Sequence, residues 1–181
     1  MKKTFTLLMI FTFLSIWAVA QKQERGKDPL RFNPDRISQT QPVVIHQKSL
    51  VFYEDFSGAT IPQGWQNIAR GTPGYRWVHA GSLFNFVYID SDAADEDANV
   101  AGSLITPAID CSGMTNVLLG MYHMFWHNDN DVAKIRISTN GADFEDAFVF
   151  TSSVGDNSYP YFEYDISAFA AGHSTVYIEF Y

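Results

Sequence analysis

The sequence contains one cysteine, Cys111, so an intramolecular disulfide is excluded. It also has few basic residues after position 49. Eight of the 12 lysines and arginines lie before residue 50, whereas only three of the 20 acidic residues do, which leaves 17 acidic and four basic residues for the rest. Such an acidic domain repels phosphate backbones and anionic membranes, so nucleic acid is excluded as a partner. Bound cations are its natural complement.

The sequence contains no recognisable catalytic motif. A nucleophile elbow, a zincin motif, a phosphate-binding loop and a cysteine–histidine arrangement are all missing. Cys111 has no partner motif and is interpreted as a buried structural thiol. We therefore expect no enzyme active site, although a glycosidase-type pair stays open because carboxylates are abundant.

The N-terminus has the pattern of a cleaved secretory leader. Two lysines precede an apolar run from Phe5 to Ala20, which ends in the motif Ala-Val-Ala. This pattern predicts a signal peptide over residues 1–20, a mature chain that starts at Gln21, and a protein that is secreted or held at the cell surface. The run is short for a membrane span, so no membrane insertion is expected after cleavage.

The remainder divides into a linker and one domain. Residues 21–49 are polar and contain prolines, which indicates a linker or pro-segment. From residue 50 onward, short aromatic and β-branched runs alternate with turn signals, of which Asn140-Gly141 is the strongest. The expected strands are 50–53, 75–78, 84–89, 103–106, 117–126, 133–138, 147–150, 162–165 and 176–180. This pattern predicts an all-β domain over residues 50–181, a jelly-roll-type antiparallel β-sandwich.

The densest polar cluster lies in residues 90–97, where five of eight side chains are carboxylates. These groups repel one another unless they are solvated or bridged by a cation. Calcium takes six to eight oxygen ligands, and carboxylates on an irregular loop suit it, although the spacing is not that of an EF-hand. A solvated acidic loop is the alternative. The expected ligands of a structural calcium ion are Glu54, Asp90, Asp92, Asp95 and Asp97.

Five motifs, in order along the chain, resemble those of the cleaved-adhesin and choice-of-anchor domains of bacterial secreted and surface proteins, which are MAM-like jelly rolls. The motifs lie at residues 52–65 (FYEDF and IPQGW), 88–94 (YIDSDAA), 103–110 (SLITPAID), 135–144 (IRISTNGADF) and 165–180 (DIS and VYIEF). The resemblance implies a calcium-stabilised jelly roll, often exported by type IX secretion, that serves as a binding module beside enzymes.

From the residues and this resemblance we expect a non-catalytic, calcium-stabilised extracellular adhesin for a host or matrix protein or a glycan. Its ligand-binding residues stay unassigned. Members of the family usually continue into one more strand and further domains, so we expect this chain to be C-terminally truncated, to lack its last strand, and to have further domains of the same polypeptide as partners. Two alternatives stay open: a carbohydrate-active enzyme or accessory jelly roll, and a structural spacer of a larger surface protein.

Overall fold

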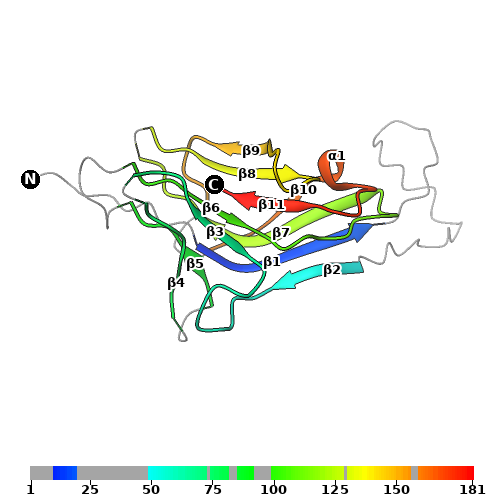
Figure 1. The fold of residues 1–181 in the computed structure, drawn as a ribbon, viewed down its shortest axis with the longest axis horizontal. Helices are drawn as coiled ribbons and strands as arrows, with labels where there is room; N and C mark the ends of the chain where they lie inside the picture. Colours follow the sequence, from blue (N-terminus) through cyan, green and yellow to red (C-terminus); the bar gives the residue numbers. More distant parts are fainter. Residues whose placement is uncertain are drawn as a thin grey trace, which may run out of the picture.

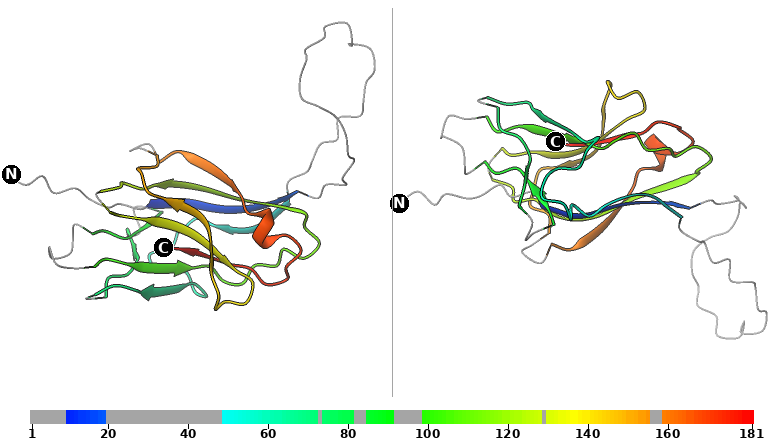
Figure 2. Two further views of the ribbon diagram at one scale, coloured as in Figure 1. Left: turned by 90° about the horizontal axis from the view of Figure 1, so that it is seen from above. Right: turned by 60° about the horizontal axis from the view of Figure 1, so that its bottom comes forward.

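Two antiparallel β-sheets pack face to face in the computed structural model (Figures 1 and 2). The structure describes residues 49–72, 74–81, 85–91, 99–128, 130–155 and 159–181, and the backbone of residues 10–19. Within these ranges no helix is long and apolar enough to cross a membrane.

The larger sheet has six strands in the order β10-β7-β1-β5-β4, with β2 paired to β1 as well. All of its pairings are antiparallel. Its strands are β1 (Ile10–Val19), β2 (Ser49–Glu54), β4 (Val78–His79), β5 (Val87–Tyr88), β7 (Asn116–Met124) and β10 (Tyr161–Asp165).

The smaller sheet has five strands in the order β3-β6-β11-β8-β9, again antiparallel throughout. A short helix, α1 (Ser167–Ala170), follows β10. The strands of this sheet are β3 (Gln66–Ala69), β6 (Gly102–Ile105), β8 (Ala133–Ser138), β9 (Glu145–Phe150) and β11 (Tyr177–Phe180).

The core lies between the two sheets and follows the period of two that strands impose. Along β7, every second side chain from Val117 to His123 is buried, and β8 and β11 bury alternate aliphatic and aromatic residues in the same way. The buried residues of these three strands that face the core are Val117, Leu119, Met121, His123, Ala133, Ile135, Ile137, Ile178 and Phe180. The predicted all-β antiparallel sandwich is confirmed.

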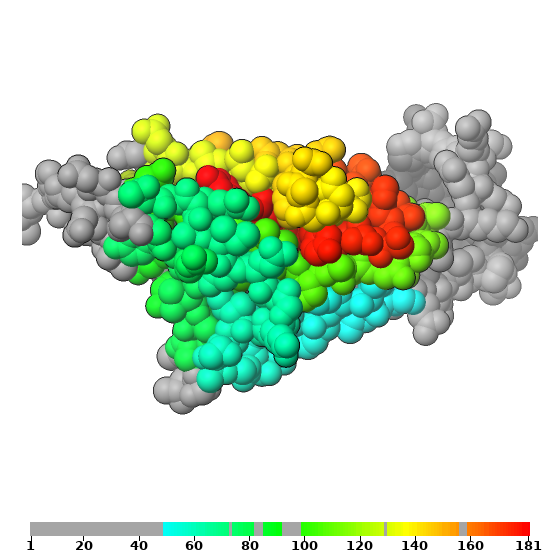
Figure 3. Space-filling model, viewed as in Figure 1, coloured from blue at the N-terminus to red at the C-terminus, as the bar shows by residue number. Residues whose placement is uncertain are grey.

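The connection between β8 and β9 confirms the predicted hairpin at Asn140-Gly141. Gly141 has a φ of 75°, a conformation that favours glycine. The Asn140 side-chain oxygen accepts hydrogen bonds from the backbone N–H groups of Ala142 (2.8 Å) and Asp143 (2.9 Å). The loop is therefore held by its own side chain, and it stands out beside β11 in the space-filling view (Figure 3).

Strand β1 comes from the segment whose sequence predicts the apolar part of a secretory leader. Its backbone pairs with β7 over most of its length, from Ile10 opposite Met124 to Val19 opposite Asn116, and with β2 from Leu14 to Ala18. Figure 1 shows β1 in blue between these two neighbours. Cleavage of residues 1–20 stays a prediction, but the segment that it would remove is a central strand of the six-stranded sheet.

Candidate functional site

The five predicted calcium ligands are only partly within the described residues. Asp92, Asp95 and Asp97 lie outside them. Asp90 lies two residues after the end of β5 and is half-buried. Glu54 ends β2, and its Oε1 accepts a hydrogen bond of 2.7 Å from the backbone N–H of Phe56. Among the residues that the structure describes, no three histidine, cysteine or acidic side chains form a group suited to a metal ion.

The Glu54 hydrogen bond holds a tight turn that leads out of β2. Phe56 has a φ of 51°, which is unusual for a residue other than glycine, and its side chain is fully buried. The Phe56 carbonyl oxygen lies 2.8 Å from Nε2 of His79, whose Nδ1 accepts a hydrogen bond from the Gly81 N–H. Nε2 therefore carries the ring proton and donates the hydrogen bond to the Phe56 carbonyl oxygen. A carboxylate has two oxygens, so Oε2 of Glu54 stays compatible with calcium, which prefers all-oxygen ligands.

A different site emerges on the outer face of the five-stranded sheet. A groove of about 410 Å³ opens there, which we call the basic groove. It is lined by Arg70, Lys134, Arg136, Ala142, Phe144 and Tyr181. Three of the four basic residues that follow position 49 thus line one groove in an otherwise acidic domain.

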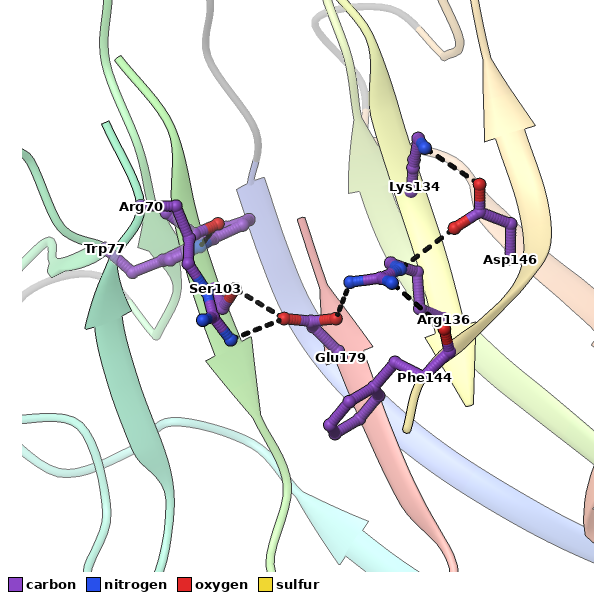
Figure 4. Close-up of polar contacts among 9 residues, drawn as sticks. Arg70, Trp77, Ser103, Lys134, Arg136, Phe144, Asp146 and Glu179 are labelled. Carbon is purple, nitrogen blue, oxygen red and sulfur yellow. Dashed lines mark hydrogen bonds and ion pairs between the residues drawn. The ribbon is translucent and has the colours of Figure 1, made fainter. Parts of the chain in front are cut away.

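The centre of this face is Glu179 of β11, whose side chain is 0% exposed. Arg136 Nη1 donates to its Oε2 at 2.6 Å, and Arg70 Nη2 donates to its Oε1 at 3.3 Å. The Ser103 hydroxyl donates to the same Oε1 and accepts a hydrogen bond of 2.8 Å from Arg70 Nε. Figure 4 shows this chain of contacts crossing the sheet from Arg70 to Asp146. The buried carboxylate is therefore paired on both of its oxygens, as a buried charge must be.

Asp146 of β9 continues the row at the far edge. Its two oxygens accept hydrogen bonds from Lys134 Nζ (2.8 Å) and Arg136 Nε (2.9 Å). The hydrogen bond from Lys134, together with that from Arg136, lowers the pKa of the Asp146 carboxyl. Lys134 and Arg136 are two residues apart on one strand, so they point to the same face of the sheet. This spacing aligns both cations along the groove.

Aromatic side chains complete the groove. The guanidinium carbon of Arg136 lies 5.9 Å from the centre of the Phe144 ring, within the range of a cation–π contact. Arg136 also donates from Nη2 to the Phe144 backbone oxygen at 2.9 Å, which fixes the loop over the strand. Tyr181 is the second aromatic residue of the lining. The groove thus combines positive charge with flat apolar surface.

The cations of the groove keep hydrogen-bonding capacity. An arginine side chain has five N–H donors and an ammonium has three. Arg70 uses Nε and Nη2 within the described part of the chain and keeps 41% of its side chain exposed, while Lys134 makes one such contact and is 29% exposed. These donors can receive an anion, and an arginine fork binds a carboxylate or a phosphate group in a bidentate manner.

The sequence contains one local signal for this site that overall composition does not show. Counting charges shows that the domain is acidic, but it does not show that Arg70 and Arg136 lie on opposite sides of one buried glutamate. The local signal is the spacing of Lys134 and Arg136, which are two residues apart. This spacing places two positive charges on one face of a strand, in a domain that has only four basic residues after position 49.

One further reactive group, the thiol of Cys111, is buried. Cys111 has no exposed surface, and burial raises the pKa of its thiol to about 11, which confirms the prediction of a buried thiol. A thiol with that pKa is a poor nucleophile at neutral pH.

Comparison with protein-family models, with curated proteins and with solved structures found no match to this chain.

Proposed function

We propose that this chain is an extracellular binding module whose basic groove holds a carboxylate-bearing glycan. The observation that carries the proposal is the gathering of Arg70, Lys134 and Arg136 in one groove whose lining includes two aromatic residues. Arginine forks bind carboxylates in a bidentate manner, and aromatic rings offer a flat surface to a sugar ring. The acidic remainder of the domain repels an anionic ligand, which confines binding to the groove.

The proposal includes export of the mature chain and a role as an adhesin, in keeping with the resemblance to cleaved-adhesin domains. The groove volume, about 410 Å³, lies within the range of small-ligand sites. A sheet that carries the cations holds them more precisely than a flexible loop would. No step of bond cleavage is needed to account for these contacts.

The first prediction concerns ligand binding. Isothermal titration with an oligosaccharide of uronic acids and with a neutral oligosaccharide of the same length should show binding only of the acidic one. Arg70→Gln and Lys134→Gln should each weaken that binding about tenfold or more, because each removes a charge-assisted hydrogen bond. Higher ionic strength should weaken it further.

Arg76→Gln is the matched control for this experiment. It removes the fourth basic residue of the domain, and its guanidinium contacts the Asn67 backbone oxygen rather than the groove. The melting temperature of every variant is recorded so that misfolding is recognised. Equal binding of the neutral sugar, or equal loss of affinity in Arg76→Gln, would rule out the groove as the binding site.

The second prediction concerns calcium, which we propose is held near the end of β2 by Glu54, Asp90 and the three aspartates that follow. Adding calcium to a chelator-treated sample should raise the melting temperature by about 5–10 °C once its concentration is a hundred times its dissociation constant. The rise is expected because the ion binds the folded chain alone and neutralises neighbouring carboxylates.

Asp92→Asn should reduce this calcium-dependent rise, whereas Asp143→Asn should leave it unchanged. Asp143 is an exposed aspartate in the β8–β9 loop, where it accepts a hydrogen bond from Asn140. Differential scanning calorimetry at matched ionic strength provides the measurement. A melting temperature that does not respond to millimolar calcium would exclude a structural calcium ion.

A further inference from the structure

The place of β1 in the six-stranded sheet is defined on both sides by backbone pairing. At its centre, Leu14 lies opposite Met121 of β7 and opposite Glu54 of β2, and Ser15 lies opposite Gly120 and Tyr53. A strand paired on both edges is an interior strand. Its removal opens a slot in the middle of the sheet rather than shortening the sheet at one side (Figures 1 and 2).

Cleavage of the predicted leader would remove this interior strand. It would free one edge of β7, which is nine residues long, and would take from the six-residue β2 the one strand with which it pairs among the described residues. Unpaired edges of this length expose rows of N–H and C=O groups and attract another strand. The backbone of β1 also lies directly beside Leu119 and Met121 of β7, which belong to the hydrophobic core. An open slot would let water reach that part of the core.

We propose that the β1 position is a strand-acceptor slot, which leader cleavage vacates and an extended segment of a partner polypeptide then fills by β-strand addition. The proposal rests on the export that the proposed function requires, but not on its ligand. Backbone hydrogen bonds supply the affinity in this mode of recognition, and the side chains that point into the core supply the specificity.

The segment that occupies the slot in the structure defines the chemistry of its replacement. It is an extended stretch of ten residues, IFTFLSIWAV, that runs antiparallel to both β7 and β2. The sequence of this stretch is rich in β-branched and aromatic residues, which favour strands. A partner strand therefore needs about the same length, no proline within it and a similar composition. The slot and the basic groove belong to different sheets, so the two sites are separable.

The experiment uses the full chain with a specific protease site placed in the linker between residues 21 and 48. The chain is folded, purified and then cut. The N-terminal fragment should stay bound without a covalent link. A fluorescent peptide with the sequence of residues 10–19, extended by lysines for solubility, should exchange with it. Fluorescence anisotropy follows the exchange, and the melting temperature should fall when the fragment is removed and recover when the peptide is added.

The same peptide carrying Leu14→Pro is the control. Leu14 lies opposite residues of both neighbouring strands, and proline has no backbone N–H to donate there. The affinity of the variant peptide should therefore be lower than that of the original peptide by about tenfold or more. The chain that begins at Gln21 provides a second measurement. If it melts at the temperature of the full chain and binds neither peptide, the sheet closes without a donor strand and the proposal is wrong.

Titration of the acidic oligosaccharide separates this proposal from the proposed function. A chain that binds the sugar but not the peptide has a functional basic groove and no acceptor slot. A chain that binds the peptide but not the sugar has the acceptor slot, and the proposed ligand of the basic groove is then wrong. Each outcome overturns one proposal and supports the other.

Discussion

Arg136→Met is expected to lower the free energy of unfolding by about 3–5 kcal/mol, the usual cost of removing one partner of a buried ion pair. Glu179 is 0% exposed and would keep only its weaker contact with Arg70, at 3.3 Å, and the Ser103 hydroxyl. The variant also loses the contacts of Arg136 with Asp146 and with the Phe144 backbone. Equilibrium unfolding in guanidinium chloride measures the change.

Adding Glu179→Met to this variant should restore a substantial part of the loss. The double variant holds no buried carboxylate, and apolar side chains of similar size often replace a buried ion pair at little cost. Arg70, which is 41% exposed, can turn its guanidinium toward water once Glu179 is gone. The two substitutions should therefore be strongly non-additive, which is the signature of a shared network.

Lys134→Met is the control for this pair of variants. The Lys134–Asp146 ion pair is 29% and 37% exposed, and exposed pairs contribute at most about 1 kcal/mol. Its removal should change stability much less than Arg136→Met. If the double variant is less stable than Arg136→Met alone, Glu179 stabilises the fold even without Arg136, and our account of the network is wrong.

The strands with dense strand-forming residues were predicted from sequence, while those that depend on tertiary contacts were not. β8 was predicted at its observed bounds because 133–138 alternates apolar and polar residues. β3 (Gln66–Ala69) was missed because its four residues carry little strand signal, and pairing with β6 defines it. Such short edge strands form through their neighbours rather than through local propensity.

The strand predicted over 84–89 is observed as the two-residue β5 (Val87–Tyr88), and another predicted strand is also shorter than expected, for a visible reason. The sequence predicts a strand over 75–78, but β4 begins at Val78. The Asn67 side chain takes the place of a strand partner at Trp77: its Nδ2 donates to the Trp77 carbonyl at 2.8 Å, and its Oδ1 accepts from the Trp77 N–H at 3.1 Å. An asparagine side chain that forms hydrogen bonds with the backbone groups of a residue ten positions away cannot be recognised from the local pattern.

The basic groove could not be predicted because its residues are distant in sequence. Glu179 and Arg70 are 109 residues apart, and Glu179 and Arg136 are 43 apart. They meet because β11 pairs with β8, which carries Arg136, and because Arg70, which follows β3, reaches Glu179 across β6. Strand order is not contained in the alternation of a single strand. The acidic loop was visible from sequence because its carboxylates are consecutive. A cluster of charged residues that are consecutive in the chain can therefore be recognised from sequence, whereas charged residues that meet across neighbouring strands cannot.

The second large effect that we expect concerns His123, which should make the domain lose stability in mild acid. The imidazole is 0% exposed, and Nε2 is hydrogen-bonded to the Tyr164 hydroxyl at 2.6 Å. Aromatic rings surround it, with the Phe162 ring centre at 4.8 Å and the Phe150 ring centre at 5.9 Å. Burial lowers its pKa from 6.5 to about 4. The folded protein therefore keeps this histidine neutral where the unfolded chain protonates it.

Because the unfolded chain binds a proton below pH 6.5 and the folded chain does not until about pH 4, the free energy of unfolding should fall by about 3 kcal/mol between these values. Four aspartates also have lowered pKa values, but their stabilising effect is lost only at lower pH, as the pH falls through their folded-state pKa values. These residues are Asp55, Asp110, Asp146 and Asp165. The window from pH 6.5 to 4.5 therefore reports mainly on histidine.

His123→Phe should remove most of this decrease, because phenylalanine fills the same aromatic site and binds no proton. The variant loses the hydrogen bond to Tyr164, so its stability at pH 7 should be slightly lower while its dependence on pH is flatter. His173→Gln, which changes an exposed histidine, should leave the decrease as it is. Urea unfolding at pH 7.0, 5.5 and 4.5 tests the prediction. An equal decrease in wild type and His123→Phe would mean that another group takes up the proton and that His123 does not control stability in acid.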